Sequence, residues 1–157
     1  MYALRSAGKI LLENSWELCQ AGFAVYMIIL SVMDIRWRKL HITFLLSGGG
    51  LAVLGCLCER TEPGMLLAAG GAVGIIFLVI SRATKESLGY GDSILILILG
   101  VFIGFWNLLY LLLTAFFLAA VFSAIMMLKN RFSRKSAFPF VPFLTAAYIG
   151  GMIIAGY

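Results

Sequence analysis

The chain alternates long apolar stretches with short segments that are rich in charge, glycine or proline. A membrane-spanning α-helix needs about 20 predominantly apolar residues, and most of these stretches approach that length. We therefore predict an all-α fold, a polytopic membrane helix bundle with about six transmembrane helices. The six predicted spans cover about 18–35, 41–58, 64–81, 90–106, 108–128 and 138–156.

The boundary between the fourth and fifth spans is the least marked in this pattern. The alternative is one continuous helix over 93–128, which would hold about 36 residues. At about 1.5 Å per residue this helix would measure about 54 Å, which exceeds the hydrocarbon core of a bilayer. The pattern therefore favours a turn near Asn107.

Composition supports a membrane protein and leaves no room for a sizeable soluble domain. Hydrophobic residues make up 62% of the 157 residues, and the mean hydropathy is +1.04. We interpret the chain, 1–157, as a single transmembrane domain. Residues 1–17 mix charges with apolar positions, which is unlike the continuous apolar core of a removable signal peptide. This pattern is compatible with an interfacial N-terminal segment.

Basic residues mark alternate connections between the predicted spans. Arg36, Arg38 and Lys39 follow the first span, whereas the connection after the second span holds only Arg60 beside two glutamates. Lysine and arginine accumulate in cytoplasmic loops, so we predict that both termini face outward. The same bias accounts for much of the formal net charge of +5, so this charge does not by itself indicate nucleic-acid binding. The other predicted cytoplasmic connections hold Arg82, Lys85, Lys129, Arg131, Arg134 and Lys135.

The two aspartates of the chain, Asp34 and Asp92, each lie at the predicted cytoplasmic end of an apolar span. A carboxylate inside a membrane costs about 2.5–3.5 kcal/mol on insertion scales, so such residues are functional candidates. The predicted topology puts both aspartates at the same depth, where they can meet. Two adjacent carboxyl groups share one proton, so that one acts as an acid and the other as a base toward water. This is the chemistry of an aspartic protease.

Asp92 ends the sequence Gly89-Tyr90-Gly91-Asp92. Glycine lacks a Cβ atom, so the two glycines around Tyr90 allow another chain to approach the backbone closely. An extended substrate segment would then lie beside Asp92. We therefore take Gly89, Tyr90 and Gly91 as candidate substrate-binding residues.

In this order, the motifs resemble the GxGD-type aspartic prepilin peptidases, also called type IV leader peptidases. The resemblance covers Asp34 with its basic stretch, the Gly-Tyr-Gly-Asp sequence, and a proline-rich entry to the last span. It implies that Asp34 and Asp92 are the catalytic pair. It also implies that the partner is a type IV pilin-like precursor, which loses its basic leader at the cytoplasmic face of the plasma membrane. Shared depth and the resemblance together make Pro139 and Pro142 candidate substrate-lining residues.

Larger members of this family add a loop with paired Cys-x-x-Cys zinc ligands. Here Cys19, Cys56 and Cys58 lie within apolar segments, and their spacing does not match a zinc site. The single histidine, His41, has no partner ligand nearby in the sequence. We therefore expect neither metal nor cofactor. The chain resembles the short, peptidase-only branch, such as the members that serve Tad/Flp-type pili or archaeal-type filaments.

Several alternatives stay open at the level of sequence. Asp92 is followed by Ser93-Ile94, where many members of the family have a hydrophobic residue and then lysine, and His41-Ile42 departs from an Ile-Pro-Asn-like sequence. These departures are compatible with a non-catalytic assembly factor of a pilus or secretion system. A transporter with a proton relay is less favoured, because no inverted repeat is visible. The structural alternatives are that Asp34 pairs with Arg38 and that Asp92 caps a helix N-terminus. The two aspartates taken together with the order of the motifs favour the catalytic pair.

Overall fold

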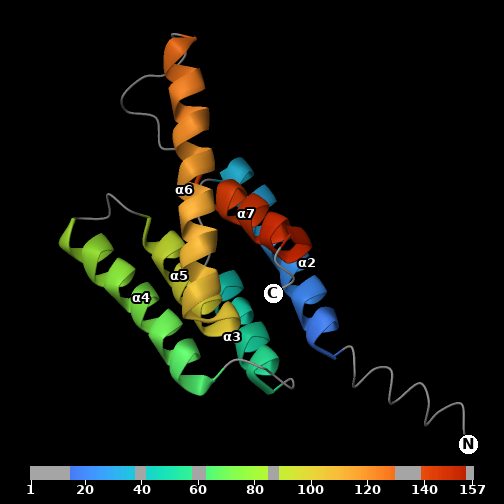
Figure 1. The fold of residues 1–157 in the computed structure, drawn as a ribbon. Helices are drawn as coiled ribbons and strands as arrows, with labels where there is room; N and C mark the ends of the chain where they lie inside the picture. Colours follow the sequence, from blue (N-terminus) through green and yellow to red (C-terminus); the bar gives the residue numbers. More distant parts are fainter. Residues whose placement is uncertain (1–14, 38–41, 58–62, 85–88, 130–138, 155–157) are drawn as a thin grey trace, which may run out of the picture.

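The computed structural model describes residues 15–37, 42–57, 63–84, 89–129 and 139–154. Every regular element within these ranges is an α-helix, and the helices follow the order predicted from the hydrophobic pattern (Figure 1). The prediction of an all-α helix bundle is therefore confirmed. The helices are α2 (Ser15–Trp37), α3 (Ile42–Leu57), α4 (Gly64–Ala83), α5 (Tyr90–Ile103), α6 (Phe105–Leu128) and α7 (Val141–Ile154).

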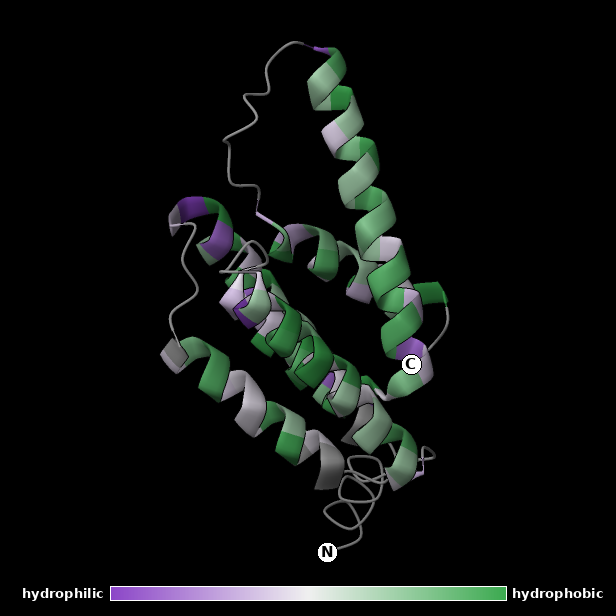
Figure 2. Cartoon of the chain, turned by 90° about the vertical axis from the view of Figure 1, so that its left-hand side faces the viewer, coloured by the Kyte–Doolittle hydropathy of each residue, from purple (hydrophilic) through white to green (hydrophobic). Residues whose placement is uncertain are grey.

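The helices differ in length. Three of the described helices are long and apolar enough to cross a membrane, namely Glu17–Trp37, Gly64–Ala83 and Phe105–Leu128. The other three are shorter apolar helices, of 16 residues in α3 and 14 residues each in α5 and α7. Helix α6 has 24 residues and extends past the other helices at its Leu128 end (Figures 1 and 2).

Many large apolar side chains are exposed on the outside of the bundle, and hydrophobic residues, coloured green, make up most of the ribbon in Figure 2. Leu46 of α3 is 71% exposed, Ile76 of α4 is 57% exposed and Leu113 of α6 is 71% exposed. Soluble monomers rarely expose contiguous apolar surface on this scale. Hydrocarbon chains, in contrast, solvate such surface without cost, so the outer faces of these helices are suited to lipid.

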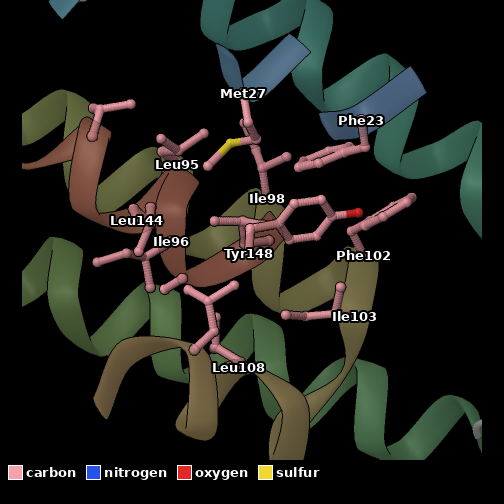
Figure 3. Packing of buried hydrophobic residues seen from close by; sticks show 14 of the residues in the cluster. Phe23, Met27, Leu95, Ile96, Ile98, Phe102, Ile103, Leu108, Leu144 and Tyr148 are labelled. Atoms are coloured by element: carbon pink, nitrogen blue, oxygen red, sulfur yellow. The ribbon is translucent and has the colours of Figure 1, made fainter. Parts of the chain in front are cut away.

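Helix α5 lies at the centre of the bundle, and most of its 14 residues are buried. Phe23 of α2 stacks on Phe102 of α5 with a distance of 4.2 Å between ring centroids, and Tyr148 of α7 lies 5.6 Å from Phe23 (Figure 3). All three rings are almost completely buried. Such aromatic contacts stabilise the packing beyond the area that they bury. Helices α2, α5 and α7 therefore share one apolar core.

Glycine residues allow α4 and α5 to meet backbone to backbone. A Cβ atom on Gly70 of α4 would overlap the carbonyl oxygen of Gly100 in α5, and one on Gly74 would overlap Cα of Leu97. Small residues at helix contacts permit this close approach in membrane proteins. Since Gly74 follows Gly70 while Leu97 precedes Gly100, the two helices are antiparallel.

The turn between the fourth and fifth predicted spans lies at Gly104, three residues before the predicted position at Asn107. Gly104 has a φ of 84°, a left-handed conformation that glycine adopts without steric cost. Its N–H donates to the Gly100 carbonyl at 3.1 Å, and its own carbonyl accepts from Leu108 N–H at 3.1 Å. Asn107 lies in the first turn of α6, where its side-chain amide donates to the Ile103 carbonyl. A turn is present, as predicted, and the continuous helix over 93–128 is excluded.

The two aspartates lie at the same end of the bundle. Helix α2 runs antiparallel to α7, and α4 runs antiparallel to α5, so the last turns of α2 and α4 lie near the first turns of α7 and α5. Arg36 and Arg82 lie in those last turns of α2 and α4. The described arginines therefore share one end of the bundle with Asp34 and Asp92.

Candidate functional site

Asp34 lies in the last turn of α2 and is only 7% exposed. Its Oδ2 atom accepts a hydrogen bond from the backbone N–H of Val141 at 3.3 Å. Val141 is the first residue of α7, 107 positions further along the chain. A buried carboxyl group is costly without such a partner. The amino end of α7 therefore supplies the contact that makes the position of Asp34 tolerable.

The first turn of α7 shows why Asp34 fits there. The first N–H groups of an α-helix have no partner within the helix. Phe143 and Leu144 donate to the Phe140 carbonyl at 3.1 and 3.2 Å, and Pro142 has no N–H group at all. Val141 N–H is the remaining donor of the turn, and the Asp34 carboxyl group accepts from it. Asp34 thus acts as an N-terminal cap supplied by another helix.

Asp92 lies in the first turn of α5, where Gly89 is the N-cap residue. A Cβ atom on Gly89 would lie 2.8 Å from Oδ2 of Asp92, closer than real Cβ contacts. The carboxyl group of Asp92 therefore folds back over the amino end of its own helix. A carboxylate is favoured at this place by the partial positive charge of a helix N-terminus. The absent side chain of Gly89 makes room for it.

The structure brings Asp34 and Asp92 into one site. The two carboxyl groups lie close enough for a charge on Asp34 to act on Asp92. Each lies at the amino end of a helix, Asp34 against α7 and Asp92 within α5. Asp34 is buried and Asp92 is half-buried. The arrangement is a pair of carboxyl groups at the ends of two short helices.

Ser93, directly after Asp92, attaches the start of α5 to α4. Ser93 is 1% exposed, and its hydroxyl lies 3.3 Å from the Phe77 carbonyl of α4 and 3.4 Å from the Gly89 carbonyl. Its backbone N–H donates to the Gly89 carbonyl at 3.2 Å. The sequence departure after Asp92 thus places a small buried hydroxyl where it fixes the first turn of α5.

The candidate substrate-binding residues border the same end of the bundle. Gly89 and Tyr90 are exposed, and Gly91, Pro139 and Pro142 are half-buried. The structure also explains why proline fits at position 142. Proline has no N–H group, so it removes one unpaired donor from the first turn of α7. The aromatic residues beside it pack on α6, with Phe140 5.2 Å from Phe116 and Phe143 5.6 Å from Phe122, measured between ring centroids.

Two contacts of this site were not predicted from the sequence. The sequence around Val141 does not indicate that its N–H group binds Asp34, because Asp34 lies on a helix that is distant in the sequence. Ser93 was visible only as a departure from a family pattern. His41 and Arg38 lie outside the described residues, so the pairing of Asp34 with Arg38 stays untested. In the described part of the chain, no three metal-ligating side chains gather into a cluster.

The fold and the site together define a class of protein, a polytopic membrane protein with two carboxyl groups close together at one end of its helix bundle. Comparison with known proteins makes the assignment specific. The chain belongs to the type IV leader peptidase family, whose model matches residues 21–124.

A prepilin leader peptidase/N-methyltransferase from Xanthomonas campestris pv. campestris is similar to this chain, with 26% identity over 143 residues. The match covers 84% of this chain and 50% of that protein. The chain therefore spans about half the length of this curated relative. No solved structure matches the chain.

Proposed function

We propose that this protein is an intramembrane aspartic endopeptidase that removes the basic leader peptide from type IV pilin-like precursors. The proposal is supported by the proximity of Asp34 to Asp92 at one end of the bundle, in a member of the type IV leader peptidase family. The name of the Xanthomonas relative includes a leader peptidase activity, and we propose this part of its function for the present chain.

In the proposed reaction, the two carboxyl groups share one proton. The ionised aspartate takes a proton from a water molecule, whose oxygen attacks the carbonyl carbon of the scissile bond, while the protonated aspartate donates to the carbonyl oxygen. When the C–N bond of the resulting tetrahedral intermediate breaks, the amine nitrogen takes a proton from one aspartate, and a hydroxyl group of the intermediate returns a proton to the other. The products are a carboxylic acid on the leader and an amine on the mature subunit, which exchange a proton to become carboxylate and ammonium, and the dyad is back in its starting state with one shared proton.

We further propose that the precursor is of the Tad/Flp type and that cleavage takes place at the cytoplasmic face. Support comes from Arg36 and Arg82, which lie at the same end of the bundle as the dyad and have the charge expected of a cytoplasmic end. The exposed backbone at Gly89 and Tyr90 suits an extended segment beside Asp92. The apolar helix of the precursor would then lie among the helices of the bundle.

The test is leader cleavage of a co-expressed pilin-like precursor by the wild type, Asp34→Asn and Asp92→Asn at equal membrane abundance. Asparagine keeps the shape and a hydrogen-bond acceptor but loses the acid–base chemistry, which typically contributes roughly 100- to 10,000-fold to a rate. We expect both variants to fold and neither to cleave. Glu17→Gln removes a carboxylate from the opposite end of α2 and serves as the control, with cleavage expected at the wild-type rate.

Retained cleavage in either asparagine variant would contradict the assignment of Asp34 and Asp92 as the catalytic pair. An intact precursor in the wild-type reaction would instead favour a membrane assembly factor that keeps the family fold. The environment of Ser93 would then be the first place to search for the cause, because it is the residue beside Asp92 that departs from the family pattern.

A further inference from the structure

Polar contacts connect the described residues of α7 to α2, and in the three considered below α7 provides the donor. Two of these contacts are made by side-chain hydroxyl groups that donate to backbone carbonyls of α2. The third differs, because a backbone N–H group donates to a side-chain carboxyl group. The contacts are Tyr148 Oη to the Gln20 carbonyl at 3.4 Å, Thr145 Oγ1 to the Met27 carbonyl at 3.1 Å, and Val141 N to Asp34 Oδ2 at 3.3 Å.

The third contact fixes the orientation of a carboxyl group. The terminal torsion angle of an aspartate side chain has a broad distribution of values, so the plane of the carboxyl group rotates easily unless a partner holds one of its oxygens. A hydroxyl partner would rotate with it, whereas the N–H vector of Val141 is set by the backbone of α7. The position of α7 therefore determines which way the carboxyl group of Asp34 faces.

The Val141 N–H group is the donor that is left for Asp34. Within the first turn of α7, the N–H groups of Phe143 and Leu144 bond the Phe140 carbonyl, and Pro142 has none. The contact is buried, so water does not compete strongly for the Val141 N–H.

We propose that the backbone N–H of Val141 is a positioning group for the peptidase reaction. By holding Oδ2 of Asp34, it leaves the Oδ1 atom to face the attacking water and the scissile carbonyl. This inference rests on the proposed function of the Asp34–Asp92 pair. It assigns a role in the reaction to a residue whose side chain has no reactive group.

Val141→Pro tests the proposal because it removes the N–H group. Proline is well tolerated at the first position of a helix, so α7 is expected to persist. Misplacing a catalytic group by about 1 Å costs on the order of 100-fold, and we expect kcat for leader cleavage to fall roughly 10- to 100-fold with KM unchanged. A backbone ester at Val141, introduced as the α-hydroxy analogue of valine, removes the same N–H without a ring and should lower kcat likewise.

Thr145→Val is the matched control. It removes a buried donor from the same interface between α2 and α7, one helical turn further along α7, and keeps the shape of the side chain. We expect a lower melting temperature and an unchanged kcat. If Thr145→Val lowers kcat as much as the ester does, general docking of α7 explains the effect and the positioning role is overturned.

Wild-type cleavage together with an undiminished kcat in the ester variant would overturn the inference and leave the proposed function standing. An intact precursor in the wild-type reaction would overturn both. If Val141→Pro fails to accumulate in the membrane, the kcat of the backbone-ester variant at Val141 serves as the test instead.

Discussion

Replacing Gly100 with alanine should destabilise the bundle, because the backbones of α4 and α5 touch at this position. The added Cβ atom would overlap the carbonyl oxygen of Gly70 and would lie 3.0 Å from Cδ2 of Leu108. The Gly70 oxygen belongs to the backbone, so it cannot move aside without shifting α4. Overpacking of a tight contact typically costs about 1–3 kcal/mol.

The same substitution also has a favourable component. Alanine stabilises a helix interior by roughly 0.5–1 kcal/mol relative to glycine. The net expectation for Gly100→Ala is therefore a loss of about 1–2 kcal/mol in the free energy of unfolding. Gly22→Ala provides the matched control, since a Cβ atom on Gly22 of α2 meets nothing within 4 Å. This control should be more stable than the wild type by roughly 0.5–1 kcal/mol.

The measurement is unfolding of the purified proteins in mixed micelles, titrated with a denaturing detergent and followed by circular dichroism. The two variants carry the same chemical change, so the difference between them reports on packing alone. The helix-propensity gain is the same in both variants, so the expected difference is the overpacking cost of about 1–3 kcal/mol. Equal stability of Gly100→Ala and Gly22→Ala would show that α4 and α5 do not approach as closely as described.

Two further substitutions test local features of the fold. Tyr26→Phe removes the hydroxyl that donates to the Phe44 carbonyl of α3 at 2.9 Å, and unfolding should become easier by about 1 kcal/mol; no change in the same titration would show that this contact contributes nothing. Gly104→Ala places a side chain at a φ of 84°, which should cost about 1–2 kcal/mol. A Gly104→Ala variant as stable as the wild type would contradict the left-handed turn.

Hydrophobic pattern alone was enough to predict the helices and their order, because each apolar stretch is long and bounded by charge or glycine. The position of the turn was less predictable. Asn107 and Gly104 are both turn formers, and only the left-handed backbone of Gly104 decides between them. Likewise, the pattern did not predict that α5 ends at Ile103, after 14 residues.

The candidate site was predicted in part. Asp34 and Asp92 stood out because carboxylates are rare in apolar segments, and the alternation of basic connections put them at one end. Their surroundings depend on contacts between distant helices, such as Val141 N–H to Asp34 and Ser93 to Phe77. A backbone donor is present at every residue except proline, so its role emerges only from the three-dimensional arrangement.

The unequal helix lengths have a consequence for the surrounding bilayer. Helix α6 has 24 residues and rises about 36 Å, whereas a typical hydrocarbon core is about 30 Å thick. Many of its large apolar side chains are exposed, so α6 faces lipid, whereas the shorter helix α5 is buried at the centre of the bundle. Hydrophobic mismatch of this size costs fractions of a kcal/mol per Å and is relieved when the helix tilts or the bilayer thickens locally. The acyl-chain length of the host lipid is therefore expected to act on the bundle through the tilt of α6.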